Sequence, residues 1–424
     1  MGPRGYVQVK CGDQTTKTTN DHNDTNDHND LNDTNDKRVV NYSVSQYVHL
    51  LRNEVMMTAT TPTCHEAQSF RKFVQLTLPL MLSLCVTGLM GLCDRTFLAH
   101  VSMQDLGGYA SAFVTVLLFQ IPLARFTTFG QAFVSFYNNA KDFARIGQSV
   151  WQMIWFSLLS MFVAVPVGYA IMPYVFGGSS VEASATTYFT WMIWVIFLFP
   201  LQNALTSFFI GQKKTKVVLI TCLCAQALHV LLDYLLIFGV DPYIPPMGVI
   251  GAAIALTANQ TLVCLTLLCL FLSKKQRETY GTGNYYFNRE VFSAQMRAGA
   301  PLSLAPLISI SAWVAVSRIM VLQGGDYITV FSVGSTLTVC FAFMNDALFQ
   351  AVMTSASGLL GGRHFAGLRQ LIKQAFLFLC IVVAILAVPF LVLPERFFAL
   401  LFSTPVEVSA KELLFTTGYF AWFF

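Results

Sequence analysis

The chain alternates between long apolar segments and short polar links. Nine uninterrupted apolar runs follow one another from residue 73 onward, each long enough for the ~20 residues that a spanning helix needs. A tenth run starts near Leu413 and is cut off at Phe424. We place the nine runs near residues 73–99, 108–136, 150–172, 186–211, 217–239, 248–272, 294–321, 328–359 and 374–393. This pattern lacks the short alternating segments of a transmembrane barrel and predicts an all-α polytopic membrane protein.

The composition supports this class. Hydrophobic residues make up 55% of the chain and charged residues 11%, which is more apolar surface than a soluble protein of this length would bury. The 10 cysteines are scattered singly and without metal-ligand spacing, so we interpret them as small buried hydrophobes. The net charge of +4 is concentrated in the links. We therefore expect the lipid bilayer as a partner, no nucleic acid, no cofactor, and a monomer.

Residues 1–68 are polar and differ from the rest. Asn20–Asp36 reads NDHNDTNDHNDLNDTND, a low-complexity tract with too few apolar residues to fold. We predict a disordered tail; weak binding of a divalent ion by its Asp, Asn and His side chains is the alternative.

The basic residues of the links predict the orientation. Lysine and arginine gather in the even-numbered links, whereas the odd-numbered links hold only Arg396 and Lys411. The positive-inside rule therefore places the even-numbered links and the N-terminus in the cytoplasm, for a multi-pass protein of the plasma (inner) membrane. The basic residues of the even-numbered links are Lys141, Arg145, Lys213, Lys214, Lys216, Lys274, Lys275, Arg277, Arg289, Arg297, Arg363, Arg369 and Lys373.

Several features recur along the chain at a nearly constant interval, with a small drift. Each unit starts on the same side and should hold six spans, so the two copies would be parallel and related by an axis along the membrane normal. This predicts an N-lobe (69–272), a cytoplasmic linker (273–293), and a C-lobe (294–424) that is truncated in its fourth helix after about three and a half spans. The matches are Pro79 with Pro301, Asp105 with Asp326, Phe143 with Phe365, Ala164–Pro166 with Ala387–Pro389, and Val181–Ala185 with Val406–Ala410.

Several motifs together resemble the multidrug and toxic compound extrusion (MATE) transporters. They are LPLMLSLCVTGLMGLCDRTFLAH, VSMQDLGGYASA, YNNAKDFARIGQ, SFFIGQKKTK, LLDYLLIFG with PPMGVIGAAIALT, and GLLGGRHFAGLRQ. The resemblance covers residues 73–424, with the C-terminal lobe incomplete. It implies twelve helices in two lobes and the export of organic cations and other drugs in exchange for Na⁺ or H⁺.

Two acids inside the spans are the candidate coupling residues. Asp94 aligns with the acidic residue of the family's first span, and Asp233 with an acid in the fifth span of one prokaryotic branch. Both lie about 10 Å from the predicted outer end, at ~1.5 Å per residue. Carboxylates at one depth can share a proton or hold Na⁺. The alternative is that Asp94 pairs with Arg95 and caps its helix.

Three further residues bear on the coupling ion. His229 precedes Asp233 by four residues and so shares its helical face, with Gln226 one turn deeper. The branch usually carries Asn in place of His229, so an imidazole favours H⁺ over Na⁺, although a plain interhelical hydrogen bond is an alternative. Thr257 falls one residue later than the family's usual threonine, and the seventh span lacks the glutamate of the Na⁺-coupled branch. Both departures weaken the case for Na⁺ at Asp94 and Asp233.

Polar residues elsewhere in the spans are candidates for contact with the substrate. Arg125 and Asp346 are as far apart in the sequence as Asp105 and Asp326, which match between the two repeats. They are therefore candidates for pairing across the lobes. The alternative is that each charge is satisfied within its own lobe. The buried amides can contact substrate or bond neighbouring helices. They are Gln120, Gln202, Asn203, Gln226, Asn259, Gln260 and Asn345.

The sequence thus predicts a transporter and not an enzyme: a cation-coupled antiporter that exports hydrophobic or cationic drug-like compounds, with H⁺ favoured over Na⁺. One alternative is a lipid-linked oligosaccharide flippase of the same superfamily, which would need a cationic cleft for pyrophosphate. Another is a membrane-embedded transferase, which would need an acidic metal cluster such as DDxxD or a buried His–carboxylate site at the interface; the spans lack such a cluster, and His229 with Asp233 is its one support. The third is a truncated remnant that does not transport.

Overall fold

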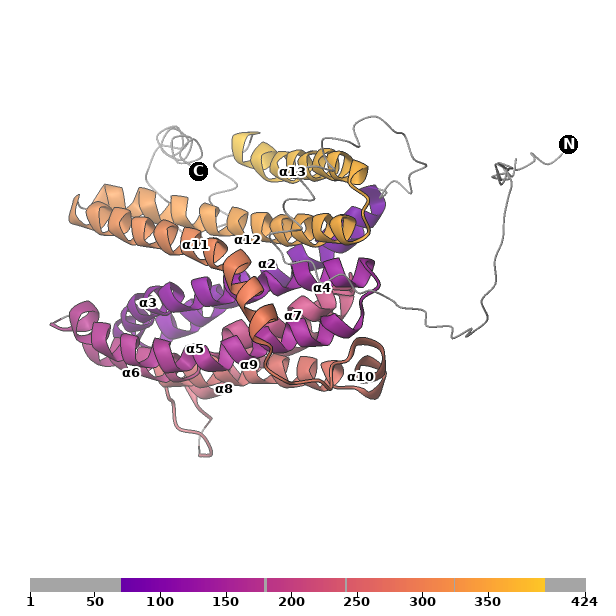
Figure 1. Ribbon diagram of the computed structural model, residues 1–424. Helices are drawn as coiled ribbons and strands as arrows, with labels where there is room; N and C mark the ends of the chain where they lie inside the picture. Colours follow the sequence, from indigo (N-terminus) through magenta and orange to yellow (C-terminus); the bar gives the residue numbers. More distant parts are fainter. Residues whose placement is uncertain (1–69, 179–180, 241, 324, 393–424) are drawn as a thin grey trace, which may run out of the picture. The chain divides into compact units, whose positions relative to one another are not determined.

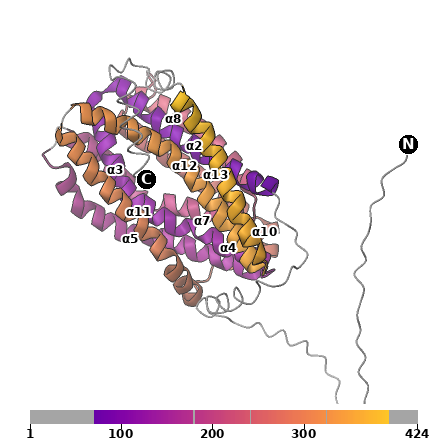
Figure 2. The same ribbon diagram turned by 90° about the horizontal axis from the view of Figure 1, so that it is seen from above.

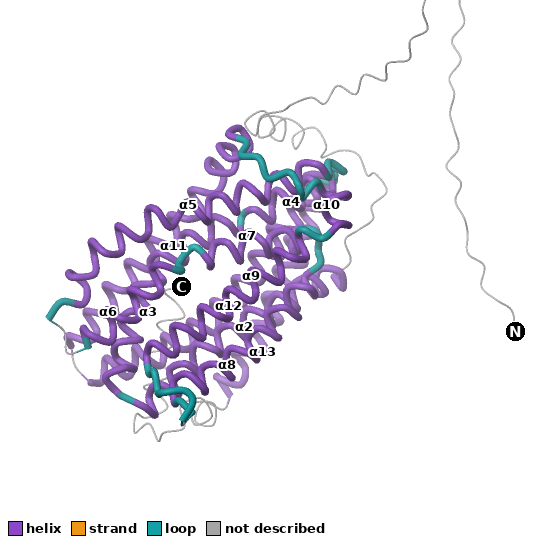
Figure 3. The backbone as a smooth tube through the Cα atoms, turned by 90° about the horizontal axis from the view of Figure 1, so that it is seen from below, coloured by secondary structure: helices purple, strands orange, loops and turns teal. Residues whose placement is uncertain are grey.

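The structure, a computed structural model, describes residues 70–178, 181–240, 242–323 and 325–392. These residues form twelve helices, and Figure 3 shows no strand among them, which confirms the all-α prediction. The predicted tail (1–68) and the tenth apolar run lie outside the described residues. The helices are α2 (Phe70–Val101), α3 (Met103–Thr128), α4 (Gly130–Asn139), α5 (Ala144–Phe176), α6 (Glu182–Trp194), α7 (Leu198–Gly211), α8 (Thr215–Phe238), α9 (Val249–Phe271), α10 (Lys274–Tyr280), α11 (Arg289–Gln323), α12 (Gly325–Gly361) and α13 (Ala366–Val392).

Length and hydropathy support a membrane-spanning bundle. Six segments among the described residues are long and apolar enough to cross a bilayer, and α6 and α7 together make a seventh if the bent pair is one span. The helices α11 and α12, of 35 and 37 residues, cover the predicted spans 294–321 and 328–359. Helices α3 and α4 follow each other closely enough to count as one segment, Gln104–Asn139.

The predicted fourth span, 186–211, is broken rather than continuous. Helices α6 and α7 meet at an angle of 43° around residues 195–197. Pro200 explains the break, because proline lacks the N–H that would bond to the carbonyl of Ile196 and its ring crowds that carbonyl.

Contacts between helices far apart in the sequence determine where the later helices lie. Helix α2 packs against α8, and α8 packs against α9. Helix α12 lies along both α2 and α4, while α11 lies along α3 (Figures 1 and 2). The predicted C-lobe helices therefore cover the first two spans of the predicted N-lobe.

The helix boundaries repeat along the chain with the same separation as Pro79 and Pro301, the matched prolines of the two repeats. Helix α3 starts at Met103 and α12 at Gly325, which is the same separation. The ends of α4 and α12, and the starts of α5 and α13, are separated by this interval as well. This agreement supports the proposed internal repeat.

The ends of α4 and α12 also share one cap. A basic residue with positive φ follows each helix, Lys141 at 62° and Arg363 at 58°. Such left-handed caps satisfy the last carbonyls of a helix, and a basic side chain there complements the helix dipole. The capping bonds recur at the repeat interval: Ala140 N to Phe136 O (2.9 Å) matches Gly362 N to Gly358 O (3.0 Å), and Asp142 N to Tyr137 O (3.0 Å) matches His364 N to Leu359 O (2.8 Å).

Basic residues crowd this end of the bundle, which we call the basic end and define by the links 140–143, 212–214, 273–288 and 362–365. Lys213, which follows α7, likewise has a φ of 62°. Burial, with a contribution from nearby Lys72, lowers the pKa of Lys213. Burial also lowers the pKa of Lys214, and Lys275 adds to that effect.

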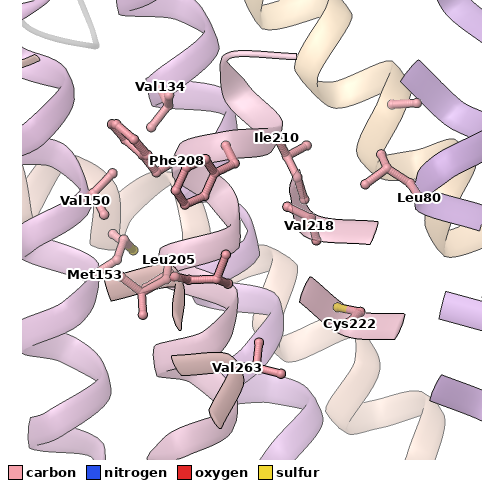
Figure 4. Packing of buried hydrophobic residues seen from close by; sticks show 14 of the residues in the cluster. Leu80, Val134, Val150, Met153, Leu205, Phe208, Ile210, Val218, Cys222 and Val263 are labelled. Carbon is pink, nitrogen blue, oxygen red and sulfur yellow. The ribbon is translucent and has the colours of Figure 1, made fainter. Parts of the chain in front are cut away.

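Two apolar clusters hold the helices together. The first lies in the half of the bundle nearest the basic end, where Phe208 and Leu205 of α7 face Val134 of α4 and Met153 of α5 (Figure 4). The second lies in the other half and centres on aromatic residues of α3 and α6, with Tyr109 and Tyr188 at ring centroids 5.0 Å apart. All six of these residues are at most 1% exposed, so this packing fixes the helix positions at both depths.

The linker between the predicted lobes is fastened to α5. The indole nitrogen of Trp151 donates to the carbonyl of Thr282 (2.8 Å), and that of Trp155 donates to the carbonyl of Tyr285 (3.0 Å). Further along, the Gln295 amide donates to the Ser149 hydroxyl (2.6 Å). The linker is therefore part of the packed structure and is not a free tether.

Gly147 allows this close approach, and we expect Gly147→Ala to lower the thermal stability of the purified protein. A Cβ at Gly147 would lie 2.6 Å from the carbonyl oxygens of Tyr280 and Gly281, so α5 and the linker would have to separate. Overpacking of this kind costs about 1–3 kcal/mol. Gly91→Ala is the matched control, because a Cβ there meets nothing within 4 Å. An equal melting temperature for the two variants would contradict this account.

Candidate functional site

The described residues contain one group of three or more acids, histidines or cysteines with ligand atoms close together: Asp94 of α2 with His229 and Asp233 of α8. One ligand atom from each residue lies within 4.8 Å of the other two. His229 Nε2 lies 3.0 Å from Asp233 Oδ2 and 3.5 Å from Asp94 Oδ1. The three residues are 0–3% exposed, and we call them the carboxylate–histidine site.

Helix geometry explains why these residues meet. His229 and Asp233 are four residues apart, so both side chains lie on the face of α8 that packs against α2. Asp94 lies seven residues before the end of α2, and Asp233 five before the end of α8, so both lie inside the same end of the bundle. The sequence predicted the two carboxylates at one depth, and the structure brings them together.

A tyrosine that sequence reasoning missed completes the surroundings of Asp94. The Tyr109 hydroxyl of α3 donates to Asp94 Oδ2 (3.1 Å) and is 1% exposed. The ring of Tyr188 packs against Tyr109. The sequence contained one signal for this contact, the similar depth of the two residues. Tyr109 lies six residues after the start of α3, which follows directly on the end of α2.

The structure does not show the alternative for Asp94, an ion pair with Arg95. The Arg95 side chain is exposed, and its guanidinium lies over the ring of Phe113, 5.8 Å from the ring centroid. The polar contacts of Asp94 are instead with Tyr109 and His229. Asp94 therefore belongs to the buried site and not to a surface ion pair.

The site contains buried polar atoms that lack hydrogen-bond partners within the described structure. They are Asp94 Oδ1, both ring nitrogens of His229 and both oxygens of Asp233. The carboxylate oxygens are close to His229 Nε2 but do not have the alignment that a hydrogen bond requires. Buried groups of this kind are costly unless something pairs with them, so this arrangement suits a bound cation or added protons.

A chain of amides continues from this site toward the middle of the bundle. The Gln226 amide donates to the Thr87 hydroxyl (3.3 Å), and the Asn259 amide donates to Gln226 Oε1 (3.5 Å). Gln226 lies one turn before His229, as the sequence predicted. These contacts join α2, α8 and α9 in one polar layer beneath the carboxylate–histidine site.

The polar contacts of Thr257 and Asn203 are with residues outside this site. The Thr257 hydroxyl donates to Ala253 O (2.8 Å) and accepts from the Trp191 indole (2.9 Å). Asn203 donates to the carbonyl of Phe199 in its own helix (3.0 Å). Gln120 and Gln202 are half-buried, Gln260 is buried and Asn345 is exposed.

Arg125 and Asp346 form an ion pair between α3 and α12, as their repeat interval suggested. Both side chains are about a quarter exposed, at 26% and 29%. Toward the basic end, Gln131 donates to Gln350 O (3.3 Å) and Ser135 donates to Thr354 O (2.6 Å). We call this row of polar contacts the seam; it joins α3 and α4 to α12.

Comparison with known proteins finds similarity to multidrug resistance proteins and to MATE transporters. The MatE family model matches residues 79–235. A probable multidrug resistance protein NorM of Bacillus cereus is 25% identical over 265 residues, which are 60% of this chain and 57% of that protein. A probable NorM of Neisseria meningitidis is 23% identical over 308 residues, covering 70% and 66%. The chain thus spans less than two thirds of these curated relatives.

Solved structures resemble the fold over a longer stretch. A multidrug resistance MATE family transporter of the MOP superfamily, in an outward-facing conformation, has a TM-score of 0.67 at 19% identity, with 84% of this chain and 80% of that chain covered. The eukaryotic MATE transporter AtDTX14 has a TM-score of 0.67 at 15% identity, covering 82% and 77%. The chain is thus similar to MATE transporters in part of its sequence and in its fold.

Proposed function

We propose that the chain is a cation-coupled antiporter that exports hydrophobic, cationic compounds, and that the carboxylate–histidine site binds the coupling ion. The observation that carries this proposal is the burial of Asp94, His229 and Asp233 within contact of one another. Acids inside a membrane span are expensive, so they indicate a function such as ion binding or proton relay. The relatives named as multidrug resistance proteins suggest drug-like substrates.

Electrostatics gives the site two states. With both carboxylates ionised and the imidazole neutral, the site carries a charge of −2 in a place that is almost closed to solvent. Moving such a charge from water into a protein interior costs on the order of several kcal/mol per ion. Two protons, one on His229 and one shared by the carboxylates, bring the site to neutrality. The site therefore changes its charge, and with it its preferred surroundings, when protons bind.

Two features favour H⁺ over Na⁺ as the coupling ion. An imidazole ordinarily titrates near neutral pH, so His229 adds a proton acceptor where an amide would add an oxygen ligand. The Thr257 hydroxyl, the expected sixth-span ligand for Na⁺, is occupied by Ala253 and Trp191.

The seam supplies the conformational part of the cycle. Its contacts hold α3 and α4 against α12, and the positive-inside rule places its basic end in the cytoplasm. In the proposed cycle, protonation of Asp233, Asp94 and His229 reshapes the N-lobe and releases substrate outward. Opening of the seam then exposes the site to the cytoplasm, where the protons leave and the next substrate binds.

The pairing of Arg125 weighs against a lipid-linked oligosaccharide flippase. That function would need free cationic side chains in the cleft for pyrophosphate, and Arg125 is a cation that the sequence places at mid-span. Its guanidinium is instead neutralised by Asp346.

We expect dye efflux from vesicles to follow an imposed pH gradient, with little response to an imposed Na⁺ gradient. The variant His229→Asn should lower proton-driven efflux by roughly 100-fold or more, because positioned proton-transfer groups contribute on that scale. His100→Asn, a change of the same kind at an exposed residue of α2, is the matched control. Efflux driven by Na⁺ and indifferent to pH would overturn the choice of H⁺.

A further inference from the structure

We propose that the carboxylate–histidine site also binds a divalent transition-metal ion, of which Zn²⁺ is the type case, and that the bound ion blocks transport. The binding of the metal rests on the geometry of the site alone. The block rests in addition on the proposed function, because it assumes that Asp94, His229 and Asp233 must take up and release protons during the cycle.

The spacing of the ligand atoms suits a small tetrahedral ion. Zinc binds histidine nitrogen and carboxylate oxygen at about 2.0–2.2 Å, so neighbouring ligand atoms of a tetrahedral site lie about 3.4 Å apart. His229 Nε2 lies 3.0 Å from Asp233 Oδ2 and 3.5 Å from Asp94 Oδ1. The two separations that involve the nitrogen are thus close to those between zinc ligands, and one ligand atom from each of the three residues lies within 4.8 Å of the other two. The fourth position is left for water, as in zinc sites with three protein ligands.

The charge of the site favours a divalent over a monovalent ion. Two ionised carboxylates with a neutral imidazole and one divalent ion sum to zero. A monovalent ion would leave a charge of −1 on groups that are 0–3% exposed. Net charge at that depth is expensive, so a divalent ion is the better match.

The buried atoms of the site are available as ligands. Among the described residues, Asp94 Oδ1, His229 Nε2 and both oxygens of Asp233 have no hydrogen-bond partner. The other oxygen of Asp94 accepts from the Tyr109 hydroxyl, which fixes the orientation of that carboxylate. Outer contacts of this kind orient metal ligands, and removing one typically weakens metal binding by about 10–100-fold.

The imidazole is the residue that selects the kind of metal. Nitrogen ligands suit Zn²⁺, Co²⁺ and Ni²⁺, whereas carboxylate and amide oxygens suit Mg²⁺ and Ca²⁺. With asparagine at position 229 the site would offer oxygen and amide groups only. Zinc requires the neutral imidazole and competes with protons for it, so metal binding should strengthen as pH rises.

The test is a Co²⁺ titration of the purified full chain, followed by the visible absorption of tetrahedral Co²⁺ and by displacement with Zn²⁺. We expect one tight site in the unaltered protein. His229→Asn should weaken it by on the order of 100-fold or more, since a direct ligand matters more than an outer contact. Tyr109→Phe should weaken it by about 10–100-fold. The double variant His22→Asn/His28→Asn, in the Asn/Asp-rich tail, should bind Co²⁺ as the unaltered protein does.

Unchanged Co²⁺ absorption in His229→Asn, or its loss with the two tail histidines, would overturn the metal site. If His229→Asn fails to fold, Tyr109→Phe still decides the question through its weaker binding. In vesicles, Zn²⁺ should slow efflux, and Tyr109→Phe should raise the concentration for half-inhibition by about 10–100-fold. If zinc binds at the site and efflux is not slowed, the proposed inhibition of transport is wrong. Absence of efflux from the unaltered protein counts against the proposed function, while the Co²⁺ titration still decides the metal site.

Discussion

Replacement of Asp233 by Asn is expected to reduce proton-driven efflux to background while leaving the protein folded in the membrane. Asparagine has nearly the same shape but cannot carry a proton, so the site loses one of its two negative charges. A positioned group that transfers protons contributes roughly 100-fold or more, and the loss should be of that size. The measurement is dye efflux from vesicles of equal protein content under an imposed pH gradient.

The control for this variant is Asp142→Asn. Asp142 lies after α4 and pairs with Arg145 at 3.1 Å, and both side chains are about one third exposed. Exposed pairs contribute little to stability, so this change should leave both folding and efflux nearly unaltered. Undiminished efflux in Asp233→Asn would show that Asp233 is not part of the coupling site.

Loss of the Arg125–Asp346 pair is expected to open the basic end. Asp346→Ala leaves an arginine at mid-span without its partner, which should destabilise the closed seam by about 1–2 kcal/mol, between the values for exposed and buried pairs. A cysteine placed at Ser135, which is buried in the seam, should then react about tenfold faster with a maleimide. Mass spectrometry of the labelled peptide distinguishes this cysteine from the natural ones.

The double exchange Arg125→Asp/Asp346→Arg tests whether the pairing itself closes the seam. It restores opposite charges, so the labelling rate should return toward that of the unaltered pair, whereas each single change should leave it fast. Equal labelling rates in all these variants would show that the pair does not hold the seam closed.

Most of the site could be predicted because helix geometry is regular. The four-residue spacing of His229 and Asp233 places them on one face of α8, and a fixed rise per residue places Asp94 at a similar depth. The Arg125–Asp346 pair followed from the repeat interval, because equivalent positions of two parallel repeats lie at the same depth. These predictions needed distances along helices only.

Features that depend on rotation and packing were not predictable in this way. The depth of Tyr109 was available from the sequence, but its direction toward Asp94 depends on how α3 packs against α2. Thr257 is on a neighbouring helix, yet its hydroxyl faces Trp191. The attachment of the linker to α5 through Trp151 and Trp155 depends on contacts between residues that are distant in the sequence.

The central claim is that the carboxylate–histidine site gives up protons when substrate binds. The most direct measurement is the release of protons from the purified protein, in weakly buffered solution with a pH indicator, when a cationic substrate is added. The account predicts full release from the unaltered protein and from Asp142→Asn, and a smaller release from Asp233→Asn, which keeps only one of the two carboxylates. Equal release from Asp233→Asn and the unaltered protein would contradict it.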